Sequence, residues 1–397
     1  MSVKFAVLGH GVVGSGVVEL FYKNQKSIEK KAGTEMELKY ILDLRDFPDA
    51  PYADKFTKDF NDILNDDEVT AVCECMGGLE PAYTFVKSCL EKGKSVSTSN
   101  KELVAEKGDI LLAIAKEKGC NFFFEASVGG AIPIIRPLHR CLAANDIFKI
   151  SGILNGTTNF ILTKMYNDDM PFDEALKLAQ ELGYAEKDPT ADIEGHDASR
   201  KICILSSLAF GKHVYPKSVY TKGISQIDLC DVKIADQLGY AIKLIASVKK
   251  LDNDKILPSV MPMLVPRDNI ISGVDDVFNA VLVDADAVDK SMFYGRGAGK
   301  FPTASAVVGD LIETVKHHVN VFSQYWEPSQ DDSFIESIEN FSSKWYFRIP
   351  SDDNAHASVM FNCEDGLAFI TDEELTFAQA KAQAESLGAY ALIPILL

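Results

Sequence analysis

Four charged side chains between residues 182 and 205 could together move a proton on a polar substrate. The stretch LGYAEKDPTADIEGHDASRKICIL contains Glu186, Asp192, Asp197 and Lys201. Asp197 and Lys201 are four residues apart at the start of a predicted helix, so both side chains can lie on one helix face. Three carboxylates and one lysine suit a substrate that carries an ammonium group and exchanges a proton at a hydroxyl. The alternative is a solvated acidic loop with an ordinary surface ion pair.

A glycine-rich loop near the N-terminus predicts a nucleotide site. In VLGHGVVGSGVVELF, Gly9, Gly11 and Gly14 have GxGxxG spacing between a predicted strand and a predicted helix. The first glycine permits a tight turn, the second lets a pyrophosphate approach, and the third lets helix and strand pack closely. The helix begins at Val12, and the backbone amides of Val12 and Val13 at its N-terminus would face the anion. A turn without a ligand is the alternative.

The second predicted strand, in YILDLRD, ends at Asp43. An acidic residue at this position normally binds the ribose hydroxyls and favours NAD. Arg45 follows two residues later and could accept a 2′-phosphate, which would favour NADP. The sequence leaves both cofactors open.

Composition narrows the class of protein. The 397 residues are 47 % hydrophobic and 25 % charged, with a net charge of -18, so we expect a folded protein that binds small molecules or other chains rather than nucleic acid or anionic lipid. Without an apolar run of membrane length or a signal peptide, we expect a cytoplasmic location. Cys73 and Cys75 form a CxC in an apolar strand, which indicates buried thiols, with a metal site or disulfide as the alternative.

The elements that must position these residues indicate an α/β protein. Up to about residue 130, strand-like runs alternate with helical periods, including a helix from Val12 to about Glu29, and predict a Rossmann-type doubly wound parallel sheet. The strand-like runs are KFAVLGH, ELKYILDL, VTAVCECM, KSVSTSN and NFFFEAS. Residues 131–290 read as an α+β domain. A polar linker at 327–332 precedes a small strand-rich unit at 341–397.

Four further motifs occur in order around the charged cluster and the glycine loop: SNKELVA, EASVGGAIPII, GILNGTTNFIL and GRGAGKFPTASAVVGD. With these motifs, residues 3–320 resemble homoserine dehydrogenases. The resemblance implies NAD- or NADP-dependent interconversion of L-homoserine and L-aspartate 4-semialdehyde in threonine, methionine and isoleucine biosynthesis. Alternatives are a Rossmann oxidoreductase for another amino-acid aldehyde or keto acid, and a non-catalytic nucleotide sensor.

The resemblance also implies roles for single residues. Lys201 matches the catalytic lysine, and Lys101 matches a second lysine near the reacting oxygen and the cofactor. Glu186, Asp192 and Asp197 match residues that hold the substrate and orient the lysine. The chemistry agrees, since reduction of an aldehyde builds negative charge on its oxygen, and a positioned ammonium can stabilise that charge and donate a proton.

Other matches concern the cofactor cleft. Met76 falls where the family's backbone meets the nicotinamide half of the cofactor, and Gly183 and Gly299 resemble glycines lining the same cleft, although plain turns would explain both. The polar cluster at 155–159 is explained equally well by helix capping. We therefore leave it outside the predicted site.

The resemblance further implies a monovalent cation, usually sodium, held by Glu125 and the backbone carbonyls of Val128, Gly130 and Ile132. One carboxylate with convergent carbonyls suits a hard cation. A loop that merely links two domains is the alternative.

The resemblance finally bears on the domains and their assembly. It implies that residues 131–290 serve catalysis and dimerisation, that 291–325 return to the nucleotide-binding domain, and that 341–397 form a truncated ACT-like unit. In that unit Pro350 is followed by SDDN and lacks the expected glycine, so a role in dimerisation competes with threonine feedback. We expect a homodimer or homotetramer.

Overall fold

The computed structural model describes residues 2–317, 326–329, 331–351, 357–363 and 366–396. The chain divides into two compact units, each assembled from separate stretches of sequence. Unit 1 comprises Met1–Ala144, Cys203–Pro216 and Arg296–Gln330, and unit 2 comprises Asn145–Ile202, Lys217–Gly295 and Asp331–Leu397.

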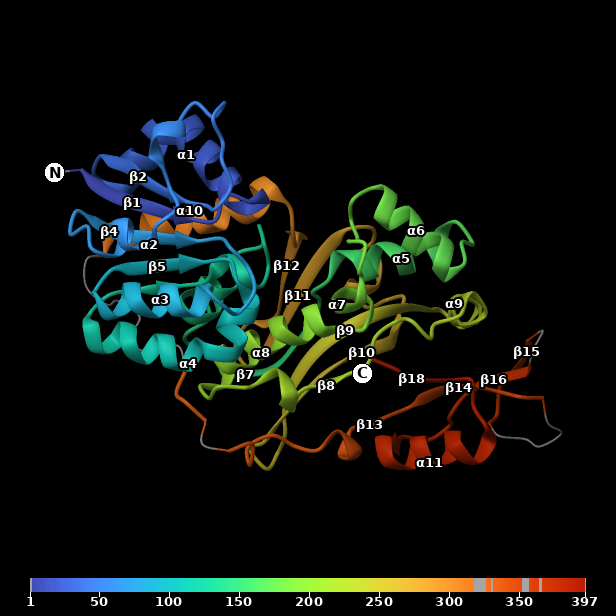
Figure 1. Ribbon diagram of the computed structural model, residues 1–397. Helices are drawn as coiled ribbons and strands as arrows, with labels where there is room; N and C mark the ends of the chain where they lie inside the picture. Colours follow the sequence, from blue (N-terminus) through green and yellow to red (C-terminus); the bar gives the residue numbers. More distant parts are fainter. Residues whose placement is uncertain (1, 318–325, 330, 352–356, 364–365, 397) are drawn as a thin grey trace. The chain divides into compact units, whose positions relative to one another are not determined.

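Unit 1 is built on a six-stranded parallel sheet in the order β3-β2-β1-β4-β5-β6 (Figure 1). This is the doubly wound order, in which ligands bind outside the carboxyl ends of the strands where the winding reverses. That point lies between β1 and β4, which pair with each other. The predicted Rossmann-type sheet is confirmed. Its strands are β1 (Val3–Leu8), β2 (Met36–Leu42), β3 (Phe56–Thr57), β4 (Val69–Glu74), β5 (Ser95–Thr98) and β6 (Phe122–Phe123).

Helices cover both faces of this sheet, as its apolar strands require. On one face, α1 and α10 pack against β1 and β2 through a buried cluster that includes Phe5, Phe21 and Leu311. The two helices lie side by side in Figure 1, although their residues are far apart in sequence. The helices are α1 (Val12–Ala32), α2 (Phe60–Leu64), α3 (Ala82–Glu91), α4 (Lys101–Lys118) and α10 (Lys300–Lys316), with short 3-10 or π turns at Ala53–Lys55, Glu125–Ser127 and Pro137–Cys141.

Unit 2 contains a mixed sheet in the order β12-β11-β7-β9-β10-β8. The pairs of β7 with β9, β7 with β11 and β9 with β10 are antiparallel, whereas β8 pairs with β10 in parallel. Its strands are β7 (Ile147–Ile153), β8 (Tyr220–Thr221), β9 (Tyr240–Lys250), β10 (Ile256–Pro266), β11 (Phe278–Ala285) and β12 (Asp289–Arg296). The helices are α5 (Gly156–Asn167), α6 (Phe172–Glu181), α7 (Thr190–Ile193), α8 (His196–Phe210) and α9 (Leu229–Gln237), with 3-10 turns at Pro216–Ser218 and Ile270–Gly273.

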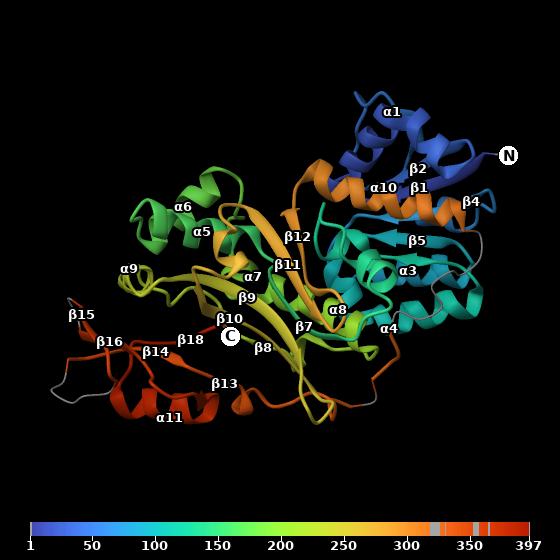
Figure 2. The ribbon, with the colours of Figure 1, turned by 180° about the vertical axis from the view of Figure 1, so that it is seen from behind.

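The C-terminal part of unit 2 forms a four-stranded antiparallel sheet, β15-β16-β14-β18, with one helix, α11. Figure 2 shows these strands and α5 on opposite sides of the larger sheet. The strand-rich character predicted for 341–397 is confirmed within the described residues, which leave out 352–356, 364–365 and 397. The elements are β13 (Ser342–Ser343), β14 (Trp345–Ile349), β15 (Met360–Cys363), β16 (Gly366–Ile370), β17 (Leu375–Thr376), α11 (Phe377–Leu387) and β18 (Ala391–Pro394), after a 3-10 turn at Ile338–Asn340.

A buried ion pair fastens this C-terminal sheet to α9. Asp231 accepts hydrogen bonds from Arg348 Nε at 2.8 Å and from the Tyr346 hydroxyl at 2.9 Å. Phe341 and Leu396 add apolar contacts to the core below the larger sheet. The small sheet therefore has a core of its own, which includes Trp345, Phe347 and Phe369, and is further anchored to the rest of unit 2.

Several predicted segments fall partly outside the described residues. These are 318–325 of the predicted returning segment, Gln330 of the linker, and 352–354 of the turn after Pro350. Among the helices of the described ranges, none combines the length and the apolar character that a membrane span needs.

Candidate active site

The glycine loop has the conformation and the space that a dinucleotide requires. Gly9 has a φ of +89°, which an L side chain rarely adopts. A Cβ on Gly14 would overlap the Gly9 carbonyl oxygen, so only glycine lets α1 pack this close to the turn. A Cβ on Gly11 would have no other atom within 4 Å, which leaves the backbone open to a phosphate.

The start of α1 completes this anion site. Its N-cap is Gly11, without a side-chain cap, and its first turn carries no acidic residue. The side chain of Val12 is exposed and that of Val13 is half-buried. The first amides of the helix therefore remain available to a ligand, and the helix dipole favours an anion there.

Asp43 and Arg45 form an ion pair just beyond the end of β2. Asp43 Oδ2 accepts from the His10 backbone N–H at 2.8 Å and from Arg45 Nη2 at 2.9 Å. The pKa of Asp43 lies well below its usual range, chiefly because of its hydrogen bond to Arg45. Only 9 % of the Asp43 side chain is exposed, against 63 % for Arg45. The guanidinium is thus the more accessible charge beside the glycine loop.

Met76 and Lys101 lie after two neighbouring strands, β4 and β5, at the same edge of the sheet. A Cβ on Gly9 would meet Met76 Cγ at 2.9 Å, so Met76 borders the glycine loop. Lys101 is the first residue of α4, and the N-cap Asn100 accepts from the Leu103 N–H at 3.1 Å. Asn100 also donates to the Gly78 carbonyl at 2.6 Å, which ties this helix start to the loop that follows Met76.

In unit 2, Lys201 is buried in a hydrogen-bonded cluster. Its Nζ donates to Asp197 Oδ2 at 2.8 Å and to the Leu154 carbonyl oxygen at 2.7 Å. Lys201 is 6 % exposed and Asp197 is 3 % exposed, so this i, i+4 pair is not a solvated surface pair. The acidic-loop alternative therefore does not describe Asp197 and Lys201.

Asn155 joins the carboxylates, a function that sequence reasoning missed. Its Nδ2 donates to Asp192 Oδ1 at 2.7 Å and to Asp197 Oδ2 at 2.9 Å. Its Oδ1 accepts from the Thr158 N–H at 2.8 Å and so caps α5. The polar run NGTTN signals the cap, but the contact with residues about 40 positions away has no local signal.

The pKa of Asp192 reflects this buried environment. Burial raises its pKa, and repulsion from Asp197 raises it further, while the hydrogen bond from Asn155 opposes the rise. Two carboxylates near one buried lysine suit recognition of a cationic group beside a site of proton transfer.

Other predicted residues lie apart from these contacts. Glu186 is exposed in the loop after α6, and its carboxylate makes no hydrogen bond or ion pair with any described residue. Gly183, in unit 2, ends α6 with a φ of +74°, and Gly299, in unit 1, begins α10 with a φ of +125°. Both conformations require glycine, which accounts for these residues without a ligand.

The loop predicted to hold a cation uses the Glu125 carboxylate internally. Its oxygens accept from the backbone N–H groups of Ile134 at 2.6 Å, Ile135 at 2.7 Å and Arg136 at 2.9 Å, and from Arg136 Nε at 3.1 Å. This carboxylate has little capacity left for a metal ion. The carbonyl oxygens of Val128, Gly130 and Ile132 accept no hydrogen bond from the residues that the structure describes.

A Rossmann unit with an open glycine loop and a buried lysine hydrogen-bonded to a carboxylate are the features of a nicotinamide-dependent oxidoreductase that acts on a hydroxyl or carbonyl group. Family models agree. Residues 9–125 match the model described as homoserine dehydrogenase, NAD binding domain, and residues 133–312 match the model described as homoserine dehydrogenase. The chain belongs to the homoserine dehydrogenase family, whose members are NAD(P)-dependent oxidoreductases.

Individual relatives support this assignment. A homoserine dehydrogenase of Bacillus subtilis is 41 % identical over 353 residues, covering 88 % of this chain and 81 % of the relative. The crystal structure of a homoserine dehydrogenase from Thiobacillus denitrificans has a TM-score of 0.92 and 36 % identity, and the match covers 100 % of this chain and 98 % of that one. A hyperthermophilic archaeal homoserine dehydrogenase in complex with NADPH has a TM-score of 0.65 and 27 % identity, over 79 % of this chain and 98 % of that one.

Proposed function

We propose that Lys201 exchanges the proton of the substrate hydroxyl as this chain interconverts L-homoserine and L-aspartate 4-semialdehyde. The observation that carries this role is the position of the Lys201 ammonium between the Asp197 carboxylate and the Leu154 carbonyl oxygen. The carboxylate and the carbonyl oxygen both accept from this ammonium, so they fix its position within the cluster. An ammonium held in this way can stabilise the charge on that oxygen and donate the proton.

Substrate recognition is assigned to the carboxylates. Asp192 and Asp197 are held by the same Asn155 amide, and together they would attract the ammonium of homoserine. Glu186, which is exposed nearby in sequence, is proposed as a further substrate contact, and Lys101 as a second cation near the reacting oxygen. A nicotinamide cofactor, when bound, supplies the hydride acceptor or donor.

We further propose that unit 1 binds NADP in preference to NAD. Gly9, Gly11 and Gly14 with the amides of Val12 and Val13 would hold the pyrophosphate. Arg45 occupies the Asp43 carboxylate that would otherwise bind ribose hydroxyls, and its exposed guanidinium suits a 2′-phosphate. Met76, Gly183 and Gly299 remain proposed cofactor contacts. The NADPH complex of the archaeal relative is consistent with this preference.

For the monovalent cation, the occupied Glu125 carboxylate is a poor ligand. We propose the carbonyl oxygens of Val128, Gly130 and Ile132 as its ligands and assign no catalytic step to it. Measuring activity in sodium, potassium and choline chloride at constant ionic strength would test this proposal. Equal rates in all three salts would show that no monovalent cation supports the reaction.

The assembly and cellular setting are proposed on the family alone. We propose a cytoplasmic homodimer or homotetramer that serves threonine, methionine and isoleucine biosynthesis. In this proposal residues 1–130 and 291–325 form the nucleotide-binding domain, residues 131–290 the catalytic and dimerisation domain, and residues 341–397 an ACT-like unit. Sedimentation equilibrium would give the oligomeric state directly.

The substrate assignment is tested by absorbance at 340 nm with L-homoserine and either NAD+ or NADP+ at alkaline pH. We expect a rise with NADP+ that exceeds the rise with NAD+. Parallel assays with other amino-acid alcohols and hydroxy acids address the alternative substrate. A faster reaction with one of these than with homoserine would replace the proposed function.

A further inference from the structure

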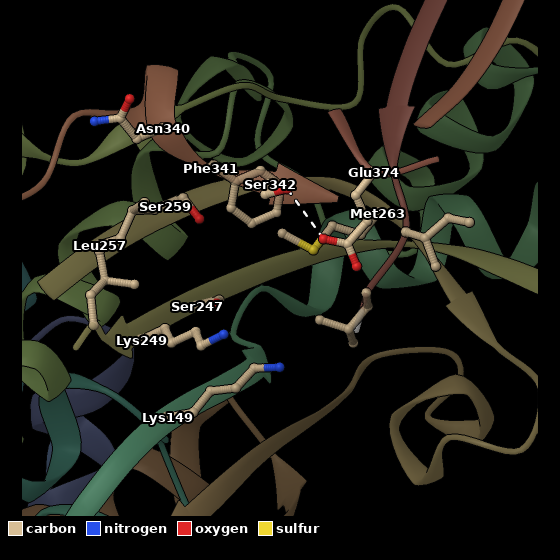
Figure 3. A pocket seen from close by; sticks show the side chains of 13 residues that line it. Lys149, Ser247, Lys249, Leu257, Ser259, Met263, Asn340, Phe341, Ser342 and Glu374 are labelled. Atoms are coloured by element: carbon tan, nitrogen blue, oxygen red, sulfur yellow. Dashed lines mark hydrogen bonds between the residues drawn. The ribbon is translucent and has the colours of Figure 1, made fainter. Parts of the chain in front are cut away.

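A cavity of about 310 Å³ lies in unit 2, between the larger sheet and the C-terminal segment, and the proposed reaction does not use it. Its floor is formed by β9 and β10, and its cover includes Phe341 and Leu396. This volume is at the lower end of small-molecule sites. Figure 3 shows two lysine side chains, Lys149 and Lys249, that extend alongside each other toward this space.

The two lysines are direct neighbours across strands. Lys149 on β7 is the register partner of Lys249 on β9. Like charges directly opposite each other destabilise a strand pair. The pKa of Lys149 is lowered chiefly by burial, and Lys249 contributes to the lowering while Asp284 opposes it. In a chain with a net charge of -18, two cations are thus brought together where sheet pairing disfavours them.

Three serines form the next row of the same sheet face. Ser151 pairs with Ser247, and Ser247 pairs with Ser259, so their side chains follow one line across β7, β9 and β10. All three are buried, at 1 %, 8 % and 1 % exposure. The Ser151 hydroxyl is buried without a hydrogen-bond partner among the described residues, whereas Ser247 and Ser259 line the cavity itself. Two hydroxyl groups of this row therefore line the same cavity as the two lysines.

We propose that this cavity binds a small organic anion, an oxyanion group on a short apolar body. The ammonium groups of Lys149 and Lys249 and the hydroxyls of Ser247 and Ser259 would donate hydrogen bonds to the oxyanion. Leu257, Met263 and Phe341 would contact the apolar part. Charged donors make the strong hydrogen bonds of such a site, and hydroxyls fix the direction.

One carboxylate also lines the cavity and must be reconciled with an anion. Glu374 is exposed at the surface and accepts from the Ser342 hydroxyl at 3.2 Å. Figure 3 shows this pair on the side where the C-terminal segment covers the cavity, away from the lysine ammonium groups. The oxyanion would therefore lie at the lysine end. Removal of the Glu374 charge should then strengthen binding.

The test is calorimetric titration of the full chain, saturated with NADP+, so that the glycine loop does not bind the probe. The probes are 4-methylpentanoate, its uncharged amide and inorganic phosphate. We expect 4-methylpentanoate to bind with a Kd below about 1 mM, and the amide and phosphate to bind at least about tenfold more weakly. Equal binding of the amide would refute the charge recognition, and equal binding of phosphate would refute the apolar wall.

Variants assign the binding to this cavity. The affinity for 4-methylpentanoate should fall about tenfold or more in Lys249→Gln and in Lys149→Gln. Glu374→Gln should strengthen it. The matched control is Lys250→Gln, because Lys250 is adjacent on β9 and pairs instead with Asp146 at 3.7 Å.

Three further results would overturn the proposal: no binding of the carboxylate at 10 times the expected Kd, equal weakening by Lys250→Gln, or weaker binding to Glu374→Gln. Sedimentation velocity of Lys249→Glu, a surface variant that should fold, measures whether this face also sets the oligomeric state. A changed oligomeric state with no carboxylate binding to the original chain would assign the cavity to a second copy of this chain and overturn the small-molecule site.

Discussion

Replacing Asn155 with aspartate would separate its two roles, which are to cap α5 and to donate hydrogen bonds to the two carboxylates. An aspartate still caps α5, since its oxygen can accept from the Thr158 N–H as Asn155 Oδ1 does at 2.8 Å. The change removes both N–H donations, at 2.7 Å to Asp192 and at 2.9 Å to Asp197, and adds a negative charge beside them. Asn155→Asp therefore keeps the helix cap while it removes the donations that position the two carboxylates.

The size of the effect follows from these two bonds. A hydrogen bond to a charged group contributes roughly 1.5–3 kcal/mol, which is about a tenfold to hundredfold change in rate if it supports only the reactive arrangement. We expect kcat/KM for homoserine to fall by at least about tenfold in protein that still folds, with a lowered thermal midpoint, because a third carboxylate enters a buried cluster. The assay is homoserine oxidation followed at 340 nm.

The pH profile distinguishes positioning from a merely structural role. The pKa of Asp192 is already raised by burial and by Asp197, and the Asn155 amide limits that rise. An aspartate at position 155 would raise it further. Because the ionised carboxylate is the form that binds an ammonium, activity is lost as the pH falls through this pKa, and the acidic limb should move to higher pH. Wild-type rates with an unmoved acidic limb would refute this reasoning.

Three further predictions follow from the fold and the cofactor loop. Gly11→Ala should weaken NADPH binding in a fluorescence titration and leave the thermal midpoint unchanged. Gly14→Ala should weaken binding and also lower the free energy of unfolding by about 1–3 kcal/mol, because its Cβ would meet the backbone. Equal midpoints for the two variants would contradict the packing described for α1. Arg45→Ala should raise the KM for NADP+ much more than that for NAD+, and a parallel change in both would remove Arg45 from the phosphate site. Arg348→Met should lower the free energy of unfolding in urea by roughly 3–5 kcal/mol, since it leaves a carboxylate buried without its cation; a loss under about 1 kcal/mol would contradict the anchoring of the C-terminal sheet.

Much of the fold could be predicted from local sequence patterns. The alternation of apolar strands with helical periods identified the parallel sheet, and the glycine spacing located its ligand-binding edge. The helix α1 extends to Ala32, beyond the predicted end near Glu29, because the polar residues that suggest a loop continue its exposed face until Gly33. Polar composition alone does not end a helix, whereas a glycine in the left-handed conformation does.

The site was less accessible to sequence reasoning, because its contacts join distant residues. The i, i+4 spacing placed Asp197 and Lys201 together, but nothing local connects Asn155 to either aspartate. A carboxylate in a motif also does not reveal its partner, and that of Glu125 is taken by three backbone amides and Arg136. The pairing of Lys149 with Lys249 depends on the register of strands 100 positions apart, which no periodicity encodes.

The central claim, that Lys201 exchanges the substrate proton, is tested most directly by the kcat of Lys201→Met for homoserine, measured beside its Kd for NADPH. Positioned acid–base groups contribute about 100- to 10,000-fold. We predict a loss of kcat in that range with an NADPH Kd close to that of the original chain, while the exposed control Lys187→Met keeps both values. A folded Lys201→Met protein that retains wild-type kcat, or one that loses NADPH binding in proportion to its activity, would contradict the account.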